Sequence, residues 1–272
     1  MTALLLLYST LVLLSFSTTK ASTLTQALCL ADQRHALLQL KKGFELTDQL
    51  QSWSASTDCC SWDGITCDQL TGLVIAVDLS DLHISGELSP ALFNLSSLQY
   101  LNLSYNSFIG VELPQTGFDR LANLTHLDLS NSGFAGQVPS GISLLTNLIS
   151  LDLSYNYFEV HDPDLQTLLR NLTNIQVLNL DGNNHFLNSY FPTFLANFSR
   201  LSVLSLSYCG LRGQFPLKIF HHTNLTVLDL TENPMLTGKL PEFTRASFLQ
   251  YLSLASTSFN GPIPDSIGNL QK

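Results

Sequence analysis

Charged residues are scarce in this chain, and basic ones are the scarcest. Asp, Glu, Lys and Arg make up 12% of the 272 residues, and 12 Lys and Arg stand against 21 Asp and Glu, which gives a formal net charge of −9. Nucleic acids and anionic membranes are bound through clustered Lys and Arg. The composition therefore argues against both as partners.

Long apolar runs are also lacking, apart from one at the amino terminus. The largely apolar segment Leu4–Leu14 is followed by a Ser/Thr-rich stretch, Lys20 and Ala21. This order is typical of a signal peptide, and the run is too short for the roughly 20 helical residues that span a bilayer. We predict a signal peptide over residues 1–21 with cleavage after Ala21, and a chain that is secreted as it stands.

Motifs of catalysis are missing as well. The sequence contains no Gly-x-Ser-x-Gly, no phosphate-binding Gly-rich loop with Lys and no kinase signature. No Cys-x-x-Cys or His-x-x-x-His pair is present, and the neighbouring His221 and His222 should point apart. We therefore predict no enzymatic activity, no cofactor and no metal site.

Cysteines are few, and four of the five lie near the amino terminus. In an exported chain such an even set indicates disulfides. Because adjacent cysteines do not readily bond to each other, and the short Trp-Asp-Gly loop suits a bridge across it, we predict the pairs Cys29–Cys59 and Cys60–Cys67. The remaining residue, Cys209, should be an unpaired thiol.

Repetition is what the chain has in abundance. The pattern apolar-x-x-apolar-x-apolar occurs eight times between Val74 and Leu254, with its central residues 24, 26, 24, 27, 26, 24 and 24 positions apart. This period indicates a leucine-rich-repeat solenoid. Short parallel strands at roughly 4.8 Å would form a ribbon about 34 Å long. The central residues are Val77, Leu101, Leu127, Leu151, Leu178, Leu204, Leu228 and Leu252.

Two further positions recur after each strand. The first holds an amide in four repeats, where it can donate to and accept from backbone groups at the turn. The second, two residues later, is apolar and should fill the outer layer, before a Gly-x-apolar-Pro phrase turns the chain. The amides are Asn106, Asn156, Asn183 and Asn233, replaced elsewhere by Leu82, Ser132, Cys209 and Thr257; the apolar residues are Ile84, Phe108, Phe134, Phe158, Leu211 and Phe259.

Residues 22–72 should form a cap over the first repeat, because terminal repeats need one. We expect Asp32 to cap a helix that ends near Gly43 and Thr47, with Trp53 and Trp62 packed in the core rather than stacking on a ligand. The apolar side of this helix would consist of Ala36, Leu37, Leu40 and Phe44.

These motifs resemble a known family. Leu-Ser-x-Asn-x-Phe-x-Gly-x-Val-Pro at this period resembles the plant-type leucine-rich repeat, and Asp32–Lys41, Leu50–Trp53 and Asp58–Asp68 resemble that family's amino-terminal domain. Together they look most like plant receptor-like proteins of the disease-resistance type, including those for Verticillium wilt, in which the cysteine pairing is the same. The resemblance implies an α/β solenoid of about eight repeats over residues 73–272, with a parallel concave β-sheet behind a helical, disulfide-bonded cap.

The resemblance also implies a function. It suggests the amino-terminal part of an extracellular recognition module that binds a protein or peptide ligand, pathogen-derived in the defence receptors. The family's full-length members lie at the plasma membrane, with a single transmembrane helix and a co-receptor kinase as signalling partner. Two alternatives share the cap and the repeat: a secreted polygalacturonase inhibitor, which ends in its own cysteine-bearing cap, and a receptor-kinase ectodomain.

The last repeat bears on these alternatives. The chain stops at Gly268–Lys272 within a repeat phrase and without a terminal cysteine cap, so we expect an open end and poor solubility of the isolated chain. The apolar residues left at that end are Leu249, Leu252, Leu254, Phe259 and Ile263.

Outward-facing tyrosines mark the candidate ligand surface, since tyrosine offers contact area with a polar tip. Alternatively, the tyrosines recur only because Ser-Tyr-Asn is a common form of the repeat. An Asp column on the same face is interpreted as solvated rather than as a site for calcium or basic groups. The candidate residues are Tyr100, Tyr105, Asn131, Tyr155, Tyr208, Glu232 and Tyr251, and the Asp column is Asp78, Asp128, Asp152 and Asp229.

Six glycosylation sequons recur with the repeat phrase. Asn94, Asn171 and Asn197 should lie on the outer side, whereas a glycan at Asn102 would cover part of the strand face. The sequons are Asn94, Asn102, Asn123, Asn171, Asn197 and Asn224.

Overall fold

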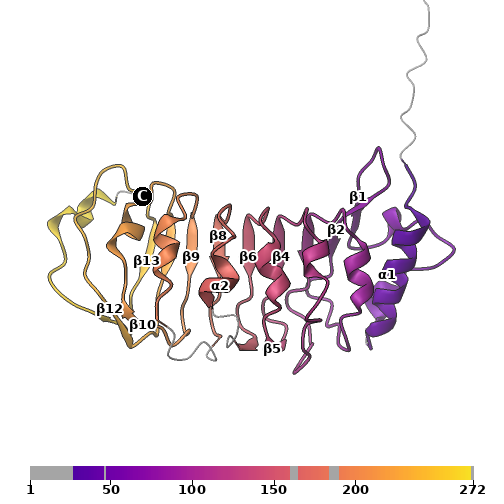
Figure 1. The fold of residues 1–272 in the computed structure, drawn as a ribbon, viewed down its shortest axis with the longest axis horizontal. Helices are drawn as coiled ribbons and strands as arrows, with labels where there is room; N and C mark the ends of the chain where they lie inside the picture. The colour runs from indigo at the N-terminus through magenta and orange to yellow at the C-terminus, as the bar shows by residue number, and fades with distance from the viewer. Residues whose placement is uncertain (1–26, 46, 160–164, 184–189, 271–272) are drawn as a thin grey trace, which may run out of the picture.

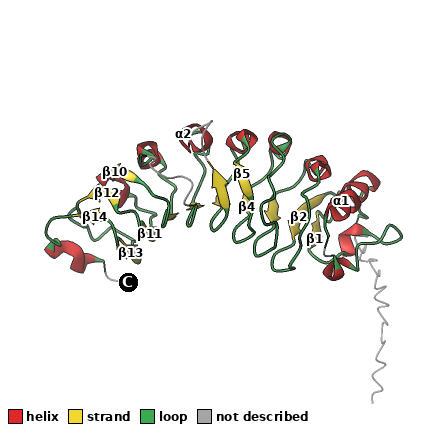
Figure 2. Cartoon of the chain, turned by 90° about the horizontal axis from the view of Figure 1, so that it is seen from below, coloured by secondary structure: helices red, strands yellow, loops and turns green. Residues whose placement is uncertain are grey.

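The protein is a curved solenoid with short strands on its inner side and short helices on its outer side (Figure 1, Figure 2). The computed structural model describes residues 27–45, 47–159, 165–183 and 190–270. The predicted signal peptide lies outside the described residues, and the domain boundaries at residues 21 and 72 stay predictions.

A nine-stranded sheet lines the inner face, in the order β1-β2-β3-β4-β6-β8-β9-β11-β13. β1 is antiparallel to β2, and every later pair is parallel. The eight strands after β1 are those of the eight predicted repeats. The bounds are β1 Ile65–Cys67, β2 Val74–Asp78, β3 Tyr100–Asn102, β4 His126–Asp128, β6 Ser150–Asp152, β8 Val177–Asn179, β9 Val203–Ser205, β11 Val227–Asp229 and β13 Tyr251–Ser253.

The register of this sheet aligns the predicted central residues in one row. Val77 pairs with Leu101, Leu101 with Leu127, and so on to Leu228 with Leu252. Seven of the eight are at most 1% exposed, whereas Leu252 on the final strand is only partly buried. Each central side chain is therefore covered by its neighbours in the row, and the last strand has a neighbour on one side only.

The predicted amide position carries the hydrogen bonds expected of it. Asn156 donates through Nδ2 to the carbonyls of Leu129, Leu153 and Ser154 at 2.7 to 3.1 Å, and its Oδ1 accepts from the Phe134 N–H at 3.0 Å. It thus joins one repeat to the preceding one. The same donor pattern recurs at Asn106, Asn183 and Asn233.

Shorter side chains fill this position less completely. Ser132 donates from its hydroxyl to the Leu103 carbonyl at 2.7 Å, and the Cys209 thiol lies 3.2 Å from the Leu180 carbonyl. Cys209 is fully buried and free, as predicted, and burial raises the pKa of its thiol. A hydroxyl or thiol donor can therefore replace the amide at this position, with fewer hydrogen bonds.

The outer layer consists of one-turn helices and a second set of short strands. Its core includes a stack of phenylalanine rings, with centroids 4.7 Å apart for Phe108–Phe134 and 6.3 Å for Phe134–Phe158. The helical segments are η3 Pro90–Asn94, η4 Phe118–Arg120, η5 Ser140–Leu144, α2 Leu165–Leu169, η7 Thr193–Asn197, η8 Leu217–His221 and η9 Asp265–Asn269; the strands are β5 Ala135–Gln137, β7 Tyr157–Glu159, β10 Arg212–Gln214, β12 Met235–Gly238 and β14 Ser258–Phe259.

The cap is a helix, two one-turn helices and β1, joined by the predicted disulfides. Cys29 bonds to Cys59, and Cys60 to Cys67, with Cα atoms 5.5 and 5.4 Å apart. The indole rings of Trp53 and Trp62 stack with their centroids 5.4 Å apart and are 3% exposed, so both are core residues as expected. The helices are α1 Ala31–Gly43, η1 Asp48–Leu50 and η2 Cys59–Ser61.

One prediction about the cap is wrong. Asp32 does not cap α1, because the helix begins at Ala31 and the N-cap position is held by Leu30, which makes no side-chain cap bond. The Asp32 carboxylate instead accepts the N–H of Gln33 within the first turn at 2.9 Å. Gln33 is itself buried, and its Oε1 accepts the Val74 N–H at 2.6 Å, which ties the cap helix to the first repeat strand.

Removing one amide should destabilise the array. We expect Asn156→Ala to lower the free energy of unfolding by about 3 kcal/mol, because it leaves buried carbonyls and the Phe134 N–H without a partner. Asn156→Ser should cost about 1 kcal/mol, since the hydroxyl keeps one donor, as Ser132 does. Urea unfolding followed by circular dichroism measures both; equal losses would contradict this account.

Candidate ligand-recognition surface

The chain turns away from the inner sheet at the same position in every repeat. Four residues after each strand centre the backbone is left-handed, with φ between 49° and 69°, although only one of the eight residues is a glycine. A side chain in this conformation costs roughly 1–2 kcal/mol. The eight are Asp81, Tyr105, Asn131, Tyr155, Gly182, Tyr208, Glu232 and Ser256, and we call them the left-handed column.

This column holds five of the seven predicted ligand-binding residues. Tyr105, Tyr155 and Tyr208 occupy equivalent places in the second, fourth and sixth repeats and are 60%, 52% and 47% exposed. Asn131 and Glu232 lie between and beyond them and are half-buried. The structure thus places the three tyrosines along one line, on the turn that follows the strands.

The glycine in the column makes room for a tyrosine. A Cβ added at Gly182 would lie 2.7 Å from Cδ1 of Tyr155, so the Tyr155 ring leans over the following repeat. Burial raises the pKa of the Tyr155 hydroxyl. The nearby carboxylates of Asp181 and Asp229 raise this pKa further, and Tyr208 adds a smaller effect of the same sign. Tyr155 therefore belongs to a group that extends across the fourth to seventh repeats.

The other two predicted tyrosines lie on strands, one on the third strand of the sheet and the other on its last strand. Tyr100 is the first residue of β3, packs against the His126 ring at 5.9 Å and accepts a hydrogen bond from Nδ2 of Asn102 at 3.2 Å. Tyr251 begins β13, is half exposed, and donates from its hydroxyl to Asp229 at 3.2 Å. Only Tyr251 joins the group around Tyr155.

The Asp column is built into the turns as well as facing outward. Oδ1 of Asp152 accepts the N–H and the hydroxyl of Ser154 at 2.9 and 2.6 Å, and its Oδ2 accepts from Asn179 at 2.9 Å. Burial raises the pKa of Asp152, and likewise that of Asp181, whose oxygens accept from Ser205 and Ser207. Sequence reasoning missed Asp181, because it occupies a position that is Ser or Thr in most repeats.

Five sequon asparagines are exposed and one is not. Asn94, Asn123, Asn171, Asn197 and Asn224 all have exposed side chains. Asn102 is only 8% exposed, with its oxygen bonded to the Ser104 N–H and its nitrogen to Tyr100. A glycan there would have to displace the Tyr100 contact. Glycosylation stays a prediction at all six sites.

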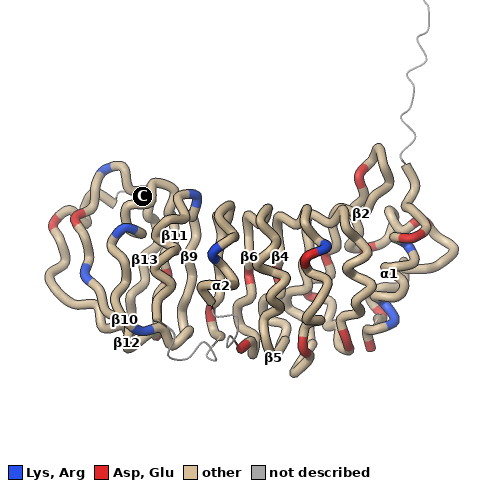
Figure 3. The backbone as a smooth tube through the Cα atoms, in the orientation of Figure 1, with Lys and Arg blue, Asp and Glu red and all other residues tan. Residues whose placement is uncertain are grey.

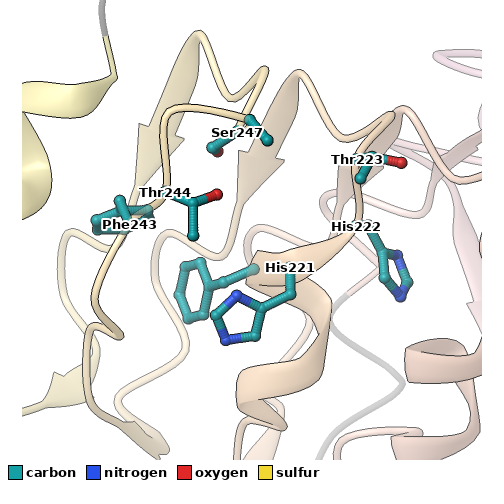
Figure 4. Close-up of a pocket in the computed structure, with 8 residues that line it drawn as sticks. His221, His222, Thr223, Phe243, Thr244 and Ser247 are labelled. Carbon is teal, nitrogen blue, oxygen red and sulfur yellow. The ribbon is translucent and has the colours of Figure 1, made fainter.

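A small hollow lies away from the inner face, between η8 and residues 243–247 (Figure 4). It measures about 230 Å³ and is lined by His221, Phe243 and Thr244 among others. The two histidine rings point apart, as predicted, and Nε2 of His222 lies 3.0 Å from the Ala196 carbonyl of the preceding repeat. The pair therefore offers no common metal position.

One group in the cap has the composition of a metal site. Ligand atoms of Cys29, Asp58, Cys59 and Cys60 lie within 4.8 Å of one another. The three sulfurs are engaged in disulfides, and Oδ1 of Asp58 accepts the backbone N–H groups of Cys29 and Cys60 at 2.9 and 3.2 Å. The cluster is therefore explained by the covalent structure of the cap.

Comparison with known proteins agrees with this architecture. Residues 30–68 match the family model described as Leucine rich repeat N-terminal domain, and models of the repeat itself match residues 97–118, 123–145, 147–168, 221–239 and 248–270. Receptor-like protein 6 of Arabidopsis thaliana is 36% identical over 94% of this chain, and Receptor-like protein 7 is 41% identical over 91%. The chain belongs to the plant leucine-rich-repeat receptor-like proteins.

This receptor-like chain spans 28% and 26% of the length of those two relatives. Among solved structures, the leucine-rich-repeat ectodomain of the Arabidopsis receptor kinase HAESA with its peptide hormone IDA is similar, with a TM-score of 0.70 and 31% identity over 89% of this chain and 44% of that one. Along the described part of this receptor-like chain, no helix combines the length and the apolar character that a membrane span requires.

The raised pKa of Asp152 predicts a pH-dependent stability. A carboxyl whose pKa is higher in the folded state stabilises the fold below its unfolded pKa, and this contribution is lost as the pH rises through the folded pKa. Asp152→Asn should therefore gain stability relative to wild type on going from pH 4 to pH 7, since Asn179 shows that an amide fits this column. Urea midpoints at the two pH values measure this; a difference that does not change with pH would contradict it.

Proposed function

We propose that this chain is the extracellular ligand-recognition module of a plant receptor-like protein. Its inner face contacts a protein or peptide ligand, in pathogen perception, and a partner receptor kinase carries the signal. The observation that carries the proposal is the line of exposed tyrosines on the turns along one edge of an open, continuous sheet. Such rigid aromatic anchors suit recognition of protein surfaces.

Three further observations support this role. HAESA, which is similar in structure, has been solved with the peptide hormone IDA and with IDA together with the co-receptor SERK1. Two disulfides in the cap suit an oxidising space outside the cytosol. The motifs of the cap and repeat resemble those of disease-resistance receptors. We therefore place the longer protein in the secretory pathway and at the outer face of the plasma membrane, as a non-catalytic binding protein.

Removing the three tyrosines of the left-handed column should impair recognition. In the complete receptor, the triple variant Tyr105→Ala, Tyr155→Ala and Tyr208→Ala should weaken ligand binding at least tenfold, about 1.4 kcal/mol. Folding should be retained, because these side chains lie outside the core. The readout is the oxidative burst of leaves that express the receptor, dosed with fractions of pathogen culture filtrate.

The matched control replaces two exposed tyrosines of the outer layer. Tyr157 and Tyr190 are 56% and 70% exposed but lie in the outer layer, where Tyr157 begins β7 and Tyr190 pairs with Arg212 of β10. Tyr157→Ala with Tyr190→Ala should therefore leave the dose response unchanged. An unchanged response in the triple variant would remove this face from the ligand site. A response to endogenous plant peptides alone would replace the defence role with a developmental one.

A further inference from the structure

Charge is distributed unevenly over the solenoid. On the strands and the turns that follow them, four positions in each of the eight repeats carry seven carboxylates in all and no Lys or Arg. These positions are the first, third and fifth residue of each aligned strand segment and the left-handed column. Six of these carboxylates are exposed or half-buried, and the seventh, that of Asp181, is buried just beneath them. The carboxylates are Asp78, Asp81, Asp128, Asp152, Asp181, Asp229 and Glu232.

Basic side chains lie on other surfaces. Arg120 and Lys218 belong to the helical segments η4 and η8 of the outer layer, and Lys41 lies in α1 of the cap. Figure 3 shows Lys and Arg on the helical segments and turns rather than along the inner strands. The excess of carboxylates is therefore local to the inner face, where it is larger than an even distribution of the net charge would give.

The inner carboxylates are held by neutral partners. Asp181 accepts from the Ser205 hydroxyl and the Ser207 N–H, both at 2.7 Å. Burial raises its pKa, and the groups that act on this pKa besides burial are hydroxyls, backbone and another carboxylate. Glu232 accepts from the Ser256 hydroxyl at 2.7 Å. Hydrogen bonds to neutral donors orient these oxygens without cancelling their charge, so the face keeps a negative potential.

Half-exposed tyrosines surround the same carboxylates. Tyr155 leans over Gly182 toward Asp181, Tyr208 follows two repeats on, and the Tyr251 hydroxyl contacts Asp229. A tyrosine ring face attracts the ammonium or guanidinium group that a carboxylate binds, and Arg combines both contacts. We call Tyr155, Asp181, Tyr208, Asp229, Glu232 and Tyr251 the acidic strip.

We propose that the acidic strip docks a Lys- or Arg-rich segment of a protein or peptide partner. The inference rests on the proposed function, in that the inner face is the recognition surface, and it adds the charge of the ligand. Complementary charge speeds encounter and rejects acidic competitors, including anionic lipid headgroups and nucleic acids. Tyrosine rings then hold the extended side chains that carry the positive charge.

The test uses the purified complete receptor and a labelled peptide of about twelve residues that alternates Arg and Ser, with a Glu-Ser peptide of equal length for comparison. Fluorescence anisotropy should show binding of the Arg peptide alone, weakened by added salt. The variant Asp181→Asn, Asp229→Asn and Glu232→Gln should weaken binding at least tenfold. The matched control Asp48→Asn, Asp119→Asn and Asp265→Asn removes the same charge from η1, η4 and η9 and should bind as wild type does.

Each outcome decides the proposal. Equal losses in the two variants, or binding of the Glu peptide, would overturn it, because attraction would then be unspecific. If circular dichroism shows that the triple variant folds poorly, Glu232→Lys replaces it in the test. The Glu232 side chain is half-buried, and within the described residues its one hydrogen bond is accepted from the Ser256 hydroxyl, so this substitution disturbs few contacts. In the leaf assay, the tyrosine variant could lose the response while the carboxylate variant responds normally. That result would support the inner face as the recognition surface and refute a cationic ligand.

Discussion

The whole structure depends on stacking, because no repeat can satisfy its own backbone or bury its own apolar side. Each strand pairs with its neighbours in register, and each amide such as Asn156 reaches carbonyls of two successive repeats. Burial and hydrogen bonding are therefore properties of neighbouring pairs, as expected for a quasi-one-dimensional array. The cap obeys the same constraint, since Gln33 supplies the acceptor that the first strand lacks.

Stacking also produces the chemistry of the inner face. Because the strands are in register, a residue type that recurs at one repeat position becomes a column on the surface. Carboxylates and amides in the third position bond to the following turn, as Asp128 does to Ser130, and so they stabilise the turn while remaining on the open face. An acidic, tyrosine-bearing surface thus arises from residues that first serve the fold, and ligand recognition can use it without a separate pocket.

Periodicity made much of this readable from the sequence. The eight strand centres, the buried phenylalanines, the cap disulfides and the free Cys209 follow from spacing and residue type, and the structure confirms them. The left-handed column was not predicted, since Tyr, Glu and Ser give no sign of positive φ, and only Asp81, Asn131 and Gly182 are of types that favour it. The lean of Tyr155 and the burial of Asn102 depend on contacts between repeats, which a single-repeat pattern does not contain.

Hydroxyl-radical footprinting of the complete receptor, with and without an active elicitor fraction, tests the central claim most directly. It reports oxidation tyrosine by tyrosine, and the chain offers tyrosines of similar exposure on both surfaces. Bound ligand should protect Tyr155, Tyr208 and Tyr251, while oxidation of Tyr157 and Tyr190 stays unchanged. Protection of the outer tyrosines with the inner ones unaffected would contradict it.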